Sequence, residues 1–283
     1  MSAANPMTDS HVFAHEAMNT TFSLRFRGLD RPVAESLVTE CIHELDRIEG
    51  KLSRFIDGSD VSRINRLAAG ETLYVTETTH QCLLAAVDAY VKTGGLFDIT
   101  LGSRIDHRKS GTSAPLPEIT GRLIIHPDVA AVTCEEPGRQ IDLGGIGKGF
   151  ALDHLKEILI DWDAEDFLLA AGASSLLAHG PSAWPVELAG DAATVRLLLH
   201  NESLSASGTR IQGSHIVHPA GDEAMPSLPC DRVWVTASTA ALAEVWSTAL
   251  MLLPMEEIAG EFGDDSGIVS IHAERMGELV KLR

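Results

Sequence analysis

The residues best suited to chemistry lie in a glycine-rich stretch, IDLGGIGKGFALD, which runs from Ile141 to Asp153. Apolar residues open it as at the end of a strand, glycines fill its middle, and apolar residues at helical spacing follow. In a strand–turn–helix of this kind, backbone N–H groups can meet a phosphate. Lys148 adds a cation at the helix start, and Asp142 is placed to meet a ligand or a metal. A turn selected only for tight packing has the same composition, so the stretch alone leaves both interpretations open.

Two common nucleotide-binding motifs do not fit this stretch. A Walker A loop needs a glycine where Asp142 stands and Ser or Thr after Lys148, where the chain has Gly149. The dinucleotide fingerprint needs G-x-G-x-x-G, and the glycines from Gly145 to Gly149 are spaced differently. The stretch is compatible with a nucleotide ligand but indicates neither of the two common nucleotide folds.

A second pair of polar residues, Glu244 and Thr248, lies in a later segment with helical apolar spacing. A separation of four residues places the carboxylate and the hydroxyl on one helix face. Oxygen ligands of this kind suit Mg²⁺ or Ca²⁺. The alternative is an exposed Glu beside a Thr that bonds back to its own helix. His215 and His218 lie three apart without an adjacent Glu or Cys, which is a weak zinc signal.

The composition limits the classes of function that the protein can have. The 283 residues are 45% hydrophobic and 22% charged, which is typical of a globular protein. The formal net charge of -18, without a visible basic patch, argues against nucleic acid as a partner. The cysteines are too widely spaced for a zinc-thiolate or disulfide framework; they are Cys41, Cys82, Cys134 and Cys230. We see neither a signal peptide nor a transmembrane stretch, so we expect a cytoplasmic protein with no membrane span.

The elements that must position these residues alternate between strands and helices. We expect a loosely ordered segment over residues 1–16 and then one α+β domain over residues 17–283, with a mixed β-sheet and packed helices. Helices are expected from Asp30 and Pro32 to Leu52, at 79–93, after the glycine turn, and at 238–253 with Ser238 as cap. Residues 103–118 are expected to form a surface loop and residues 203–219 a site loop. Strands are expected at 20–26, 73–75, 95–102, 123–125, 129–134, 167–172, 174–180, 184–190, 194–200, 231–238, 267–274 and 278–283.

Seven stretches taken together resemble the ApbE family, the FAD:protein FMN transferases or flavin transferases. Each is weak alone, but all seven occur in the order of the family. They are MNTTF (18–22), LSRF with SRIN (52–65), GLFDITLG (95–102), DLGGIGKGFALD (142–153), SASG (205–208), HIVHP (215–219) and LAEVWSTAL (242–250).

The resemblance implies an ApbE-like domain that binds FAD along a groove, with Mg²⁺ beside the pyrophosphate. It implies metal ligation by the backbone carbonyl of Gly145 and by Glu244 and Thr248. Asp142 and His215 are the candidate catalytic bases. The positions that match FAD contacts in the family are Met18, Phe55, Leu96, Phe97, Asp98, Asp142, Lys148 and Ile216.

The reaction that the resemblance implies transfers FMN from FAD to a Ser or Thr hydroxyl of a target flavoprotein, and AMP leaves. Water in place of the hydroxyl would give FMN and AMP. A catalytically silent FAD-binding homologue is the alternative from another class. It is motivated by departures from the family pattern: Asn19 for glycine, Gly172-Ala173-Ser174-Ser175 without the family's acid, His218 and Glu244 for aspartates, and a shorter loop over 103–118 that lacks the family's tryptophan segment.

Overall fold

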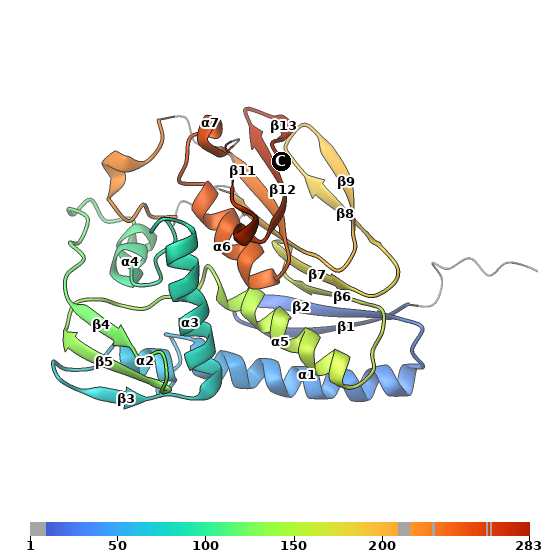
Figure 1. The fold of residues 1–283 in the computed structure, drawn as a ribbon, viewed down its shortest axis with the longest axis horizontal. Helices are drawn as coiled ribbons and strands as arrows, with labels where there is room; N and C mark the ends of the chain where they lie inside the picture. Colours follow the sequence, from blue (N-terminus) through green and yellow to red (C-terminus); the bar gives the residue numbers. More distant parts are fainter. Residues whose placement is uncertain (1–9, 209–215, 228–229, 259, 261) are drawn as a thin grey trace, which may run out of the picture.

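An eight-stranded sheet organises the molecule (Figure 1). The computed structural model describes residues 10–208, 216–227, 230–258, 260 and 262–283. Each neighbouring pair of strands in this sheet is antiparallel. The spatial order is β1 (Ser10–Ala17), β2 (Thr20–Arg27), β6 (Phe167–Ala171), β7 (Ser175–His179), β10 (Ser203–Gly208), β11 (Arg232–Ala237), β12 (Ile268–Arg275) and β13 (Glu278–Lys281).

Three helices, α1 (Arg31–Leu52), α5 (Gly147–Asp161) and α6 (Ala240–Leu250), pack on one face of this sheet. The opposite face is covered by the hairpin of β8 (Trp184–Ala189) and β9 (Thr194–Leu199). Alternate residues of each central strand therefore enter different cores. On β6, for example, Leu169 joins the helix-side core while Leu168 packs against the hairpin-side core.

The longest helix, α1, follows the expectation from its apolar period. It starts after Asp30, with Pro32 in its first turn, where the missing N–H costs no hydrogen bond. Its apolar stripe is buried at Ala34, Leu37, Cys41, Leu45, Ile48 and Leu52. In the first turn Ala34 is fully buried, and the adjacent Val33 is 49% exposed.

A smaller layer lies beside the main sheet, toward the left of Figure 1. It contains a three-stranded sheet of β3 (Thr72–Tyr74), β5 (Ala131–Glu136) and β4 (Arg122–Ile125), with helices α2 (Asp60–Ile64), α3 (Glu77–Lys92) and α4 (Gly102–Ser110). The chain is completed by a short helix, α7 (Met255–Ile258), and two 3₁₀ turns at Asp222–Ala224 and Asp264–Ser266.

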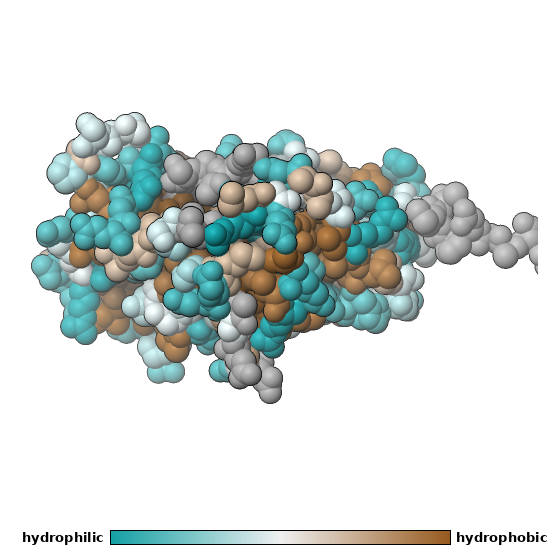
Figure 2. Space-filling model, turned by 90° about the horizontal axis from the view of Figure 1, so that it is seen from above, coloured by the Kyte–Doolittle hydropathy of each residue, from teal (hydrophilic) through white to brown (hydrophobic). Residues whose placement is uncertain are grey.

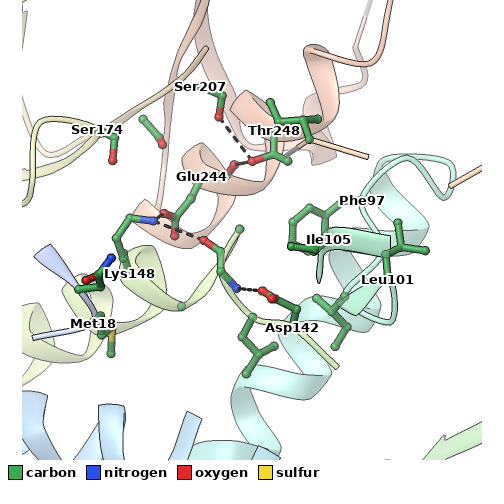
Figure 3. Close-up of a pocket in the computed structure, with 18 of the residues that line it drawn as sticks. Met18, Phe97, Leu101, Ile105, Asp142, Lys148, Ser174, Ser207, Glu244 and Thr248 are labelled. Atoms are coloured by element: carbon green, nitrogen blue, oxygen red, sulfur yellow. Dashed lines mark hydrogen bonds and ion pairs between the residues drawn. The ribbon is translucent and has the colours of Figure 1, made fainter. Parts of the chain in front are cut away.

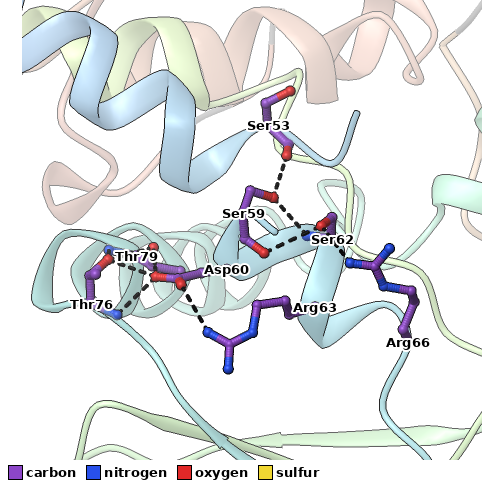
Figure 4. Close-up of polar contacts among 8 residues, drawn as sticks. All are labelled: Ser53, Ser59, Asp60, Ser62, Arg63, Arg66, Thr76 and Thr79. Atoms are coloured by element: carbon purple, nitrogen blue, oxygen red, sulfur yellow. Dashed lines mark hydrogen bonds and ion pairs between the residues drawn. The ribbon is translucent and has the colours of Figure 1, made fainter. Parts of the chain in front are cut away.

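Asp60 joins α2 to the start of α3 (Figure 4). Ser59 caps α2 by accepting a hydrogen bond from the Ser62 N–H at 2.9 Å. The Asp60 Oδ2 accepts from the Thr76 N–H and from the hydroxyls of Thr76 and Thr79, at 2.8 to 2.9 Å. Asp60 is only 3% exposed, so these bonds replace its contacts with water.

Two expectations near the chain start and the cavity were wrong. Residues 10–16, expected to be loosely ordered, form most of β1, which pairs with β2 along its whole length; residues 1–9 lie outside the described part. The inward positions of β1 include His11 and His15, so the sequence lacks the alternation of apolar and polar residues that identifies a strand. Residues 95–101 form turns and one isolated bridge from Leu101 to Gln140, not a strand. A short apolar run cannot by itself distinguish a strand from a buried turn.

Other boundaries also differ from expectation. Residues 102–110 of the expected surface loop form α4, which ends at Gly111 with a left-handed φ of 63°. Strand β10 occupies residues 203–208 of the expected site loop and lies inside the main sheet. The hairpin β8–β9, expected to extend the sheet, forms a separate two-stranded sheet. Helix α6 is capped by Thr239, whose Oγ1 accepts from Leu242 N–H, in place of Ser238.

The surface mixes residue types. Figure 2 shows polar (teal) and apolar (brown) residues interspersed over the face seen from above. Exposed apolar side chains include Phe55, Tyr74, Trp162 and Met276. All four cysteines are buried, free thiols. In the described part of the chain, none of the helices has the length and apolar character needed to cross a bilayer.

Candidate functional site

A cavity of about 1270 Å³ lies where α5 and α6 meet the smaller layer. Its walls come from the loops after α1 and α3, the glycine turn before α5, strand β10 and one face of α6. Most of the residues selected from the sequence line it: Met18, Phe55, Leu96, Phe97, Asp98, Asp142, Gly145, Lys148, Ile216, Glu244 and Thr248. Segments far apart in the chain thus converge on one space.

The glycine turn packs tightly against α6 and also borders the cavity. A Cβ on Gly149 would collide with the Ala240 carbonyl, so this glycine permits α5 and the start of α6 to touch. A Cβ on Gly145 would lie 2.9 Å from the Phe97 ring and 3.7 Å from the Thr248 Oγ1, so this glycine faces the site. Residues 141–143 belong to neither a helix nor a strand, and the Asp142 N–H donates to the Ile99 carbonyl at 2.7 Å.

Asp142 is engaged by the protein through both carboxylate oxygens. Its Oδ1 accepts from the Gly144 N–H at 2.8 Å, and its Oδ2 lies 2.7 Å from the Arg54 Nε. Arg54 has a side chain only 8% exposed and also pairs with Asp106. In this state Asp142 shapes the glycine turn and anchors Arg54. Each carboxylate oxygen keeps a second lone pair, although the Arg54 guanidinium favours the ionised form.

Glu244 occupies the centre of the site (Figure 3). It is 4% exposed, and its Oε2 accepts from the Gly149 N–H at 2.8 Å. Its Oε1 forms an ion pair with the Lys148 Nζ and accepts from the Ser175 hydroxyl at 3.4 Å. The Lys148 Nζ also lies 3.4 Å from the Gly144 carbonyl oxygen. One backbone amide of the glycine turn, the Gly149 N–H, therefore binds Glu244 in this structure.

Hydroxyl groups line the wall next to Glu244. Thr248 Oγ1 donates to the Glu244 backbone carbonyl at 3.0 Å and lies 3.5 Å from the Ser207 Oγ. Ser207 also bonds to Ser247, which reaches Ser205 at 3.2 Å. Thr248 thus does bond back to its own helix, as one interpretation held, but Glu244 is buried, contrary to that interpretation. Lone pairs of these hydroxyl oxygens that accept no hydrogen bond can coordinate a cation.

The donor set fits a hard divalent cation. Among the described residues, no three His, Cys, Asp or Glu side chains converge on one point. The candidate site instead combines one carboxylate with neutral oxygens from Gly145, Thr248 and Ser207, and Mg²⁺ commonly uses one or two carboxylates and keeps several waters. A cation already lies on the carboxylate, because the Lys148 ammonium contacts Glu244 Oε1 near the Gly144 carbonyl.

The other predicted contacts surround this centre. Met18 has a positive φ of 50° at the turn between β1 and β2. Phe55 is 76% exposed at the rim, with the Arg54 guanidinium 4.7 Å from its ring centroid. Asp98 Oδ1 accepts from both the N–H and the hydroxyl of Thr100 at 2.7 Å, so it braces its own loop. His215 lies outside the described residues.

Sequence reasoning missed several residues of this cavity. Arg54 was part of a recognised stretch, but a buried pairing with Asp142 has no local signal. Ser175 and Ser207 contact Glu244 and Thr248 from β7 and β10, which are distant in the sequence. Arg108 and Lys109 line the cavity from α4. They were not selected, because residues 103–118 were expected to form a surface loop.

Comparison with known proteins agrees with this architecture. An FAD:protein FMN transferase from Buchnera aphidicola subsp. Schizaphis graminum is 27% identical over 242 residues, covering 74% of this chain and 71% of the relative. One from Chlamydia pneumoniae is 24% identical and covers 92% of this chain and 87% of the relative. Both relatives align along most of their own length.

Solved structures support the fold. The flavinyl transferase ApbE of Pseudomonas stutzeri, in its apo form, superposes with a TM-score of 0.81 at 23% identity, covering 96% of this chain and 94% of that chain. A flavin transferase ApbE from Vibrio cholerae gives a TM-score of 0.78 at 19% identity, covering 96% of each chain. The model of the ApbE family matches residues 18–264. This chain, with its single α+β domain, belongs to the ApbE family.

Proposed function

We propose that this protein is an FAD:protein FMN transferase that moves FMN from FAD to a Ser or Thr hydroxyl of a flavoprotein acceptor. One observation carries the proposal. A cavity of about 1270 Å³ brings the glycine turn, Lys148 and the Glu244–Thr248 face of α6 together, in a member of a family whose relatives are named for this reaction. Cavities of roughly 300–1,000 Å³ suit drug-sized ligands, so this one has room for a dinucleotide.

The lining residues divide into apolar residues that would bind the rings of FAD and polar residues that would bind its pyrophosphate and the metal. The apolar rim, which includes Met18, Phe55 and Phe97, offers surfaces for the flavin and adenine rings. Lys148 supplies a cation to the pyrophosphate. The oxygens of Gly145, Glu244 and Thr248 would hold Mg²⁺, which as a Lewis acid supplies charge stabilisation in phosphoryl transfer.

The hydroxyl that attacks the FMN-side phosphorus must lose a proton, and AMP leaves with the other phosphate. Asp142 is one candidate acceptor for that proton, through the lone pairs that Arg54 and the Gly144 N–H leave free. His215 is the other candidate. Substitution of each by Asn separates them, because only the true base should shift the pH dependence of the rate.

A direct assay tests the proposal. The purified protein is incubated with FAD and Mg²⁺, with or without the acceptor of a related transferase, and both AMP and acceptor-linked flavin fluorescence are measured. AMP release that depends on the acceptor and matches its labelling is expected. AMP release without any labelling would identify an FAD hydrolase. FAD binding without AMP release under either condition would identify the silent homologue and contradict the proposal.

Ligand preference gives a check that does not need an acceptor. We expect FAD to bind more tightly than FMN, because the proposed site contacts the flavin, the pyrophosphate and the adenosine, and FMN lacks the AMP part. Titration with intrinsic tryptophan quenching as the readout measures both dissociation constants. Equal or tighter binding of FMN would contradict the proposed groove.

A further inference from the structure

The ion pair between Lys148 and Glu244 raises a question that the proposed reaction does not answer. The proposed reaction needs the Glu244 carboxylate for a metal and the Lys148 ammonium for a phosphate, yet the two charges neutralise one another here. The Lys148 side chain is 14% exposed and that of Glu244 is 5% exposed. Neither charge is well solvated, so each depends on the other.

The surroundings of Glu244 show what the ammonium contributes. Within the described part of the chain, the remaining donors to this carboxylate are the Gly149 N–H and the Ser175 hydroxyl, and both are neutral. A buried charge that loses its ionic partner is strongly unfavourable unless another charge replaces it. The ammonium can therefore leave Glu244 readily only when another cation arrives. A divalent cation on Glu244 is such a replacement.

Lys148 lies at the cavity wall on a flexible side chain. It is the second residue of α5. Its flexible four-carbon stem carries the Nζ to the Glu244 carboxylate and the Gly144 carbonyl. Rotation of that stem releases the ammonium into the cavity without movement of the helix. An anionic phosphate there would then receive a cation that was previously bound to Glu244.

We propose that Lys148 and the divalent cation exchange on Glu244, so that Lys148 is a positioning residue that couples metal binding to phosphate binding. Without metal, the ammonium holds Glu244; with metal, it is released to a phosphate-bearing ligand. The proposal rests on the proposed function, because it uses the same metal site. Coupling of this kind is reciprocal: the metal tightens binding of the phosphate ligand, and that ligand tightens binding of the metal to the same degree.

The first experiment measures metal binding without nucleotide. Mn²⁺ shares the preference of Mg²⁺ for oxygen ligands, and its unbound fraction is counted by electron paramagnetic resonance. Lys148→Met should bind Mn²⁺ about tenfold or more tightly than wild type, because the internal competitor is gone. Lys148→Gln is a second neutral variant that gives the same expectation if Met disturbs the fold. Circular dichroism melts check that each variant is folded.

Matched controls isolate the charge on Glu244. Lys148→Arg retains a cation and should stay within about threefold of wild type, because the guanidinium also competes with the metal for Glu244. Lys156→Met removes the same charge from the same helix, eight residues further on and outside the cavity lining, and should match wild type. Glu244→Gln should lose Mn²⁺ binding, which tests the metal site itself.

The second experiment measures the coupling. FAD affinity is determined by tryptophan quenching with saturating Mg²⁺ and with EDTA, in wild type and in Lys148→Met. Wild type should gain several-fold in FAD affinity from the metal, and the variant should gain less, because it has no ammonium to release. Association of Mg²⁺ with FAD in solution contributes equally to both proteins and cancels in the comparison.

The outcomes separate this inference from the proposed function. If both neutral variants at position 148 bind Mn²⁺ no more tightly than wild type while Glu244→Gln loses the metal, the exchange is wrong and the metal site stands. If Glu244→Gln binds Mn²⁺ as wild type does, the metal site and the exchange are both wrong. Tighter Mn²⁺ binding by the neutral variants, together with reduced coupling, supports the exchange.

Discussion

Asp60 and Glu244 are both buried carboxylates, and the protein satisfies them in different ways (Figures 3 and 4). Asp60 Oδ2 accepts three hydrogen bonds from Thr76 and Thr79, all at 2.8 to 2.9 Å, and the nearest cation, Arg63, is 3.9 Å from Oδ1. Glu244 accepts from one amide and one hydroxyl and takes its charge balance from Lys148.

The difference indicates which carboxylate can change partners. Burial alone would raise the pKa of Asp60, but the hydrogen bonds from Thr76 and Thr79 outweigh it and hold that pKa below its usual value. These hydrogen bonds are short, and their donors lie on α3 or at its N-cap. Asp60 therefore has a structural role and keeps its partners. Glu244 faces a cavity and is balanced by a cation on a long side chain, so a second cation can replace it.

Replacement of Glu244 should give the largest effect on function and a small one on the fold. In Glu244→Ala we expect Mg²⁺-dependent AMP release from FAD to fall about a hundredfold or more, since a metal supplies several kcal/mol of transition-state stabilisation. Alanine suits a helix interior, so α6 should persist. Steady-state rates over a range of Mg²⁺ concentrations measure the loss. Wild-type activity of the variant at limiting Mg²⁺ would refute the assigned metal site.

The same substitution at the other carboxylate should affect stability instead. Asp60→Ala leaves one amide and two hydroxyls without their acceptor, and buried unsatisfied donors cost about 1–3 kcal/mol, so we expect the free energy of unfolding to fall by about 2 kcal/mol. Urea unfolding measures this loss. Specific activity per folded molecule should stay near that of wild type, and a fall comparable to that of Glu244→Ala would remove the contrast between the two sites.

Much of the fold was predictable because long periodic segments dominate it. The apolar stripe of α1 and the alternation of β2 each repeat often enough to identify their element. Strand β1 was not predicted, because two of its inward residues are histidines. Helix α4 was not predicted, because its nine residues are mostly polar. Residues 95–101 were predicted as a strand from an apolar run that instead buries Phe97 and Ile99 beside the cavity.

The candidate site was predictable in its members but not in their pairings. The glycine turn and the Glu244–Thr248 pair each have a local spacing that indicates chemistry. The contact between Gly149 and Glu244 spans 95 residues of sequence, and the partnership of Lys148 with Glu244 depends on how α5 crosses α6. Such pairings arise from tertiary packing, for which a single sequence has no local pattern.

Asp153 is a third carboxylate, partly buried, and it provides a test that depends on pH. It accepts from the N–H groups of Ala240 and Ala241 at 2.8 and 2.9 Å, and burial raises its pKa to about 6. In the unfolded chain an Asp titrates near pH 3.9, so between these values folding takes up a proton and lowering the pH stabilises the folded state. Wild type should therefore gain about 1 kcal/mol relative to Asp153→Asn between pH 7 and pH 5.

Urea unfolding of both proteins at each pH measures this difference, and the other titrating groups cancel because both proteins share them. A gain for wild type in the opposite direction, as the pH rises, would mean that the helix amides lower the pKa of Asp153 more than burial raises it.

The smallest expected effects come from removing one hydroxyl beside each of the first two carboxylates. Thr79→Val keeps the shape of a fully buried side chain and removes a 2.9 Å bond to Asp60, so it should cost about 1 kcal/mol of unfolding free energy. Ser175→Ala removes a contact of 3.4 Å to Glu244, which is long for a hydroxyl donor, and should cost less than about 0.5 kcal/mol. The contrast follows because Asp60 depends on its hydroxyl donors, whereas Glu244 depends on the Lys148 ammonium. Equilibrium urea unfolding at pH 7 measures both changes. A loss in Ser175→Ala as large as that in Thr79→Val would show that Glu244, too, is held by fixed neutral donors, and would weaken the argument that its cation can be exchanged.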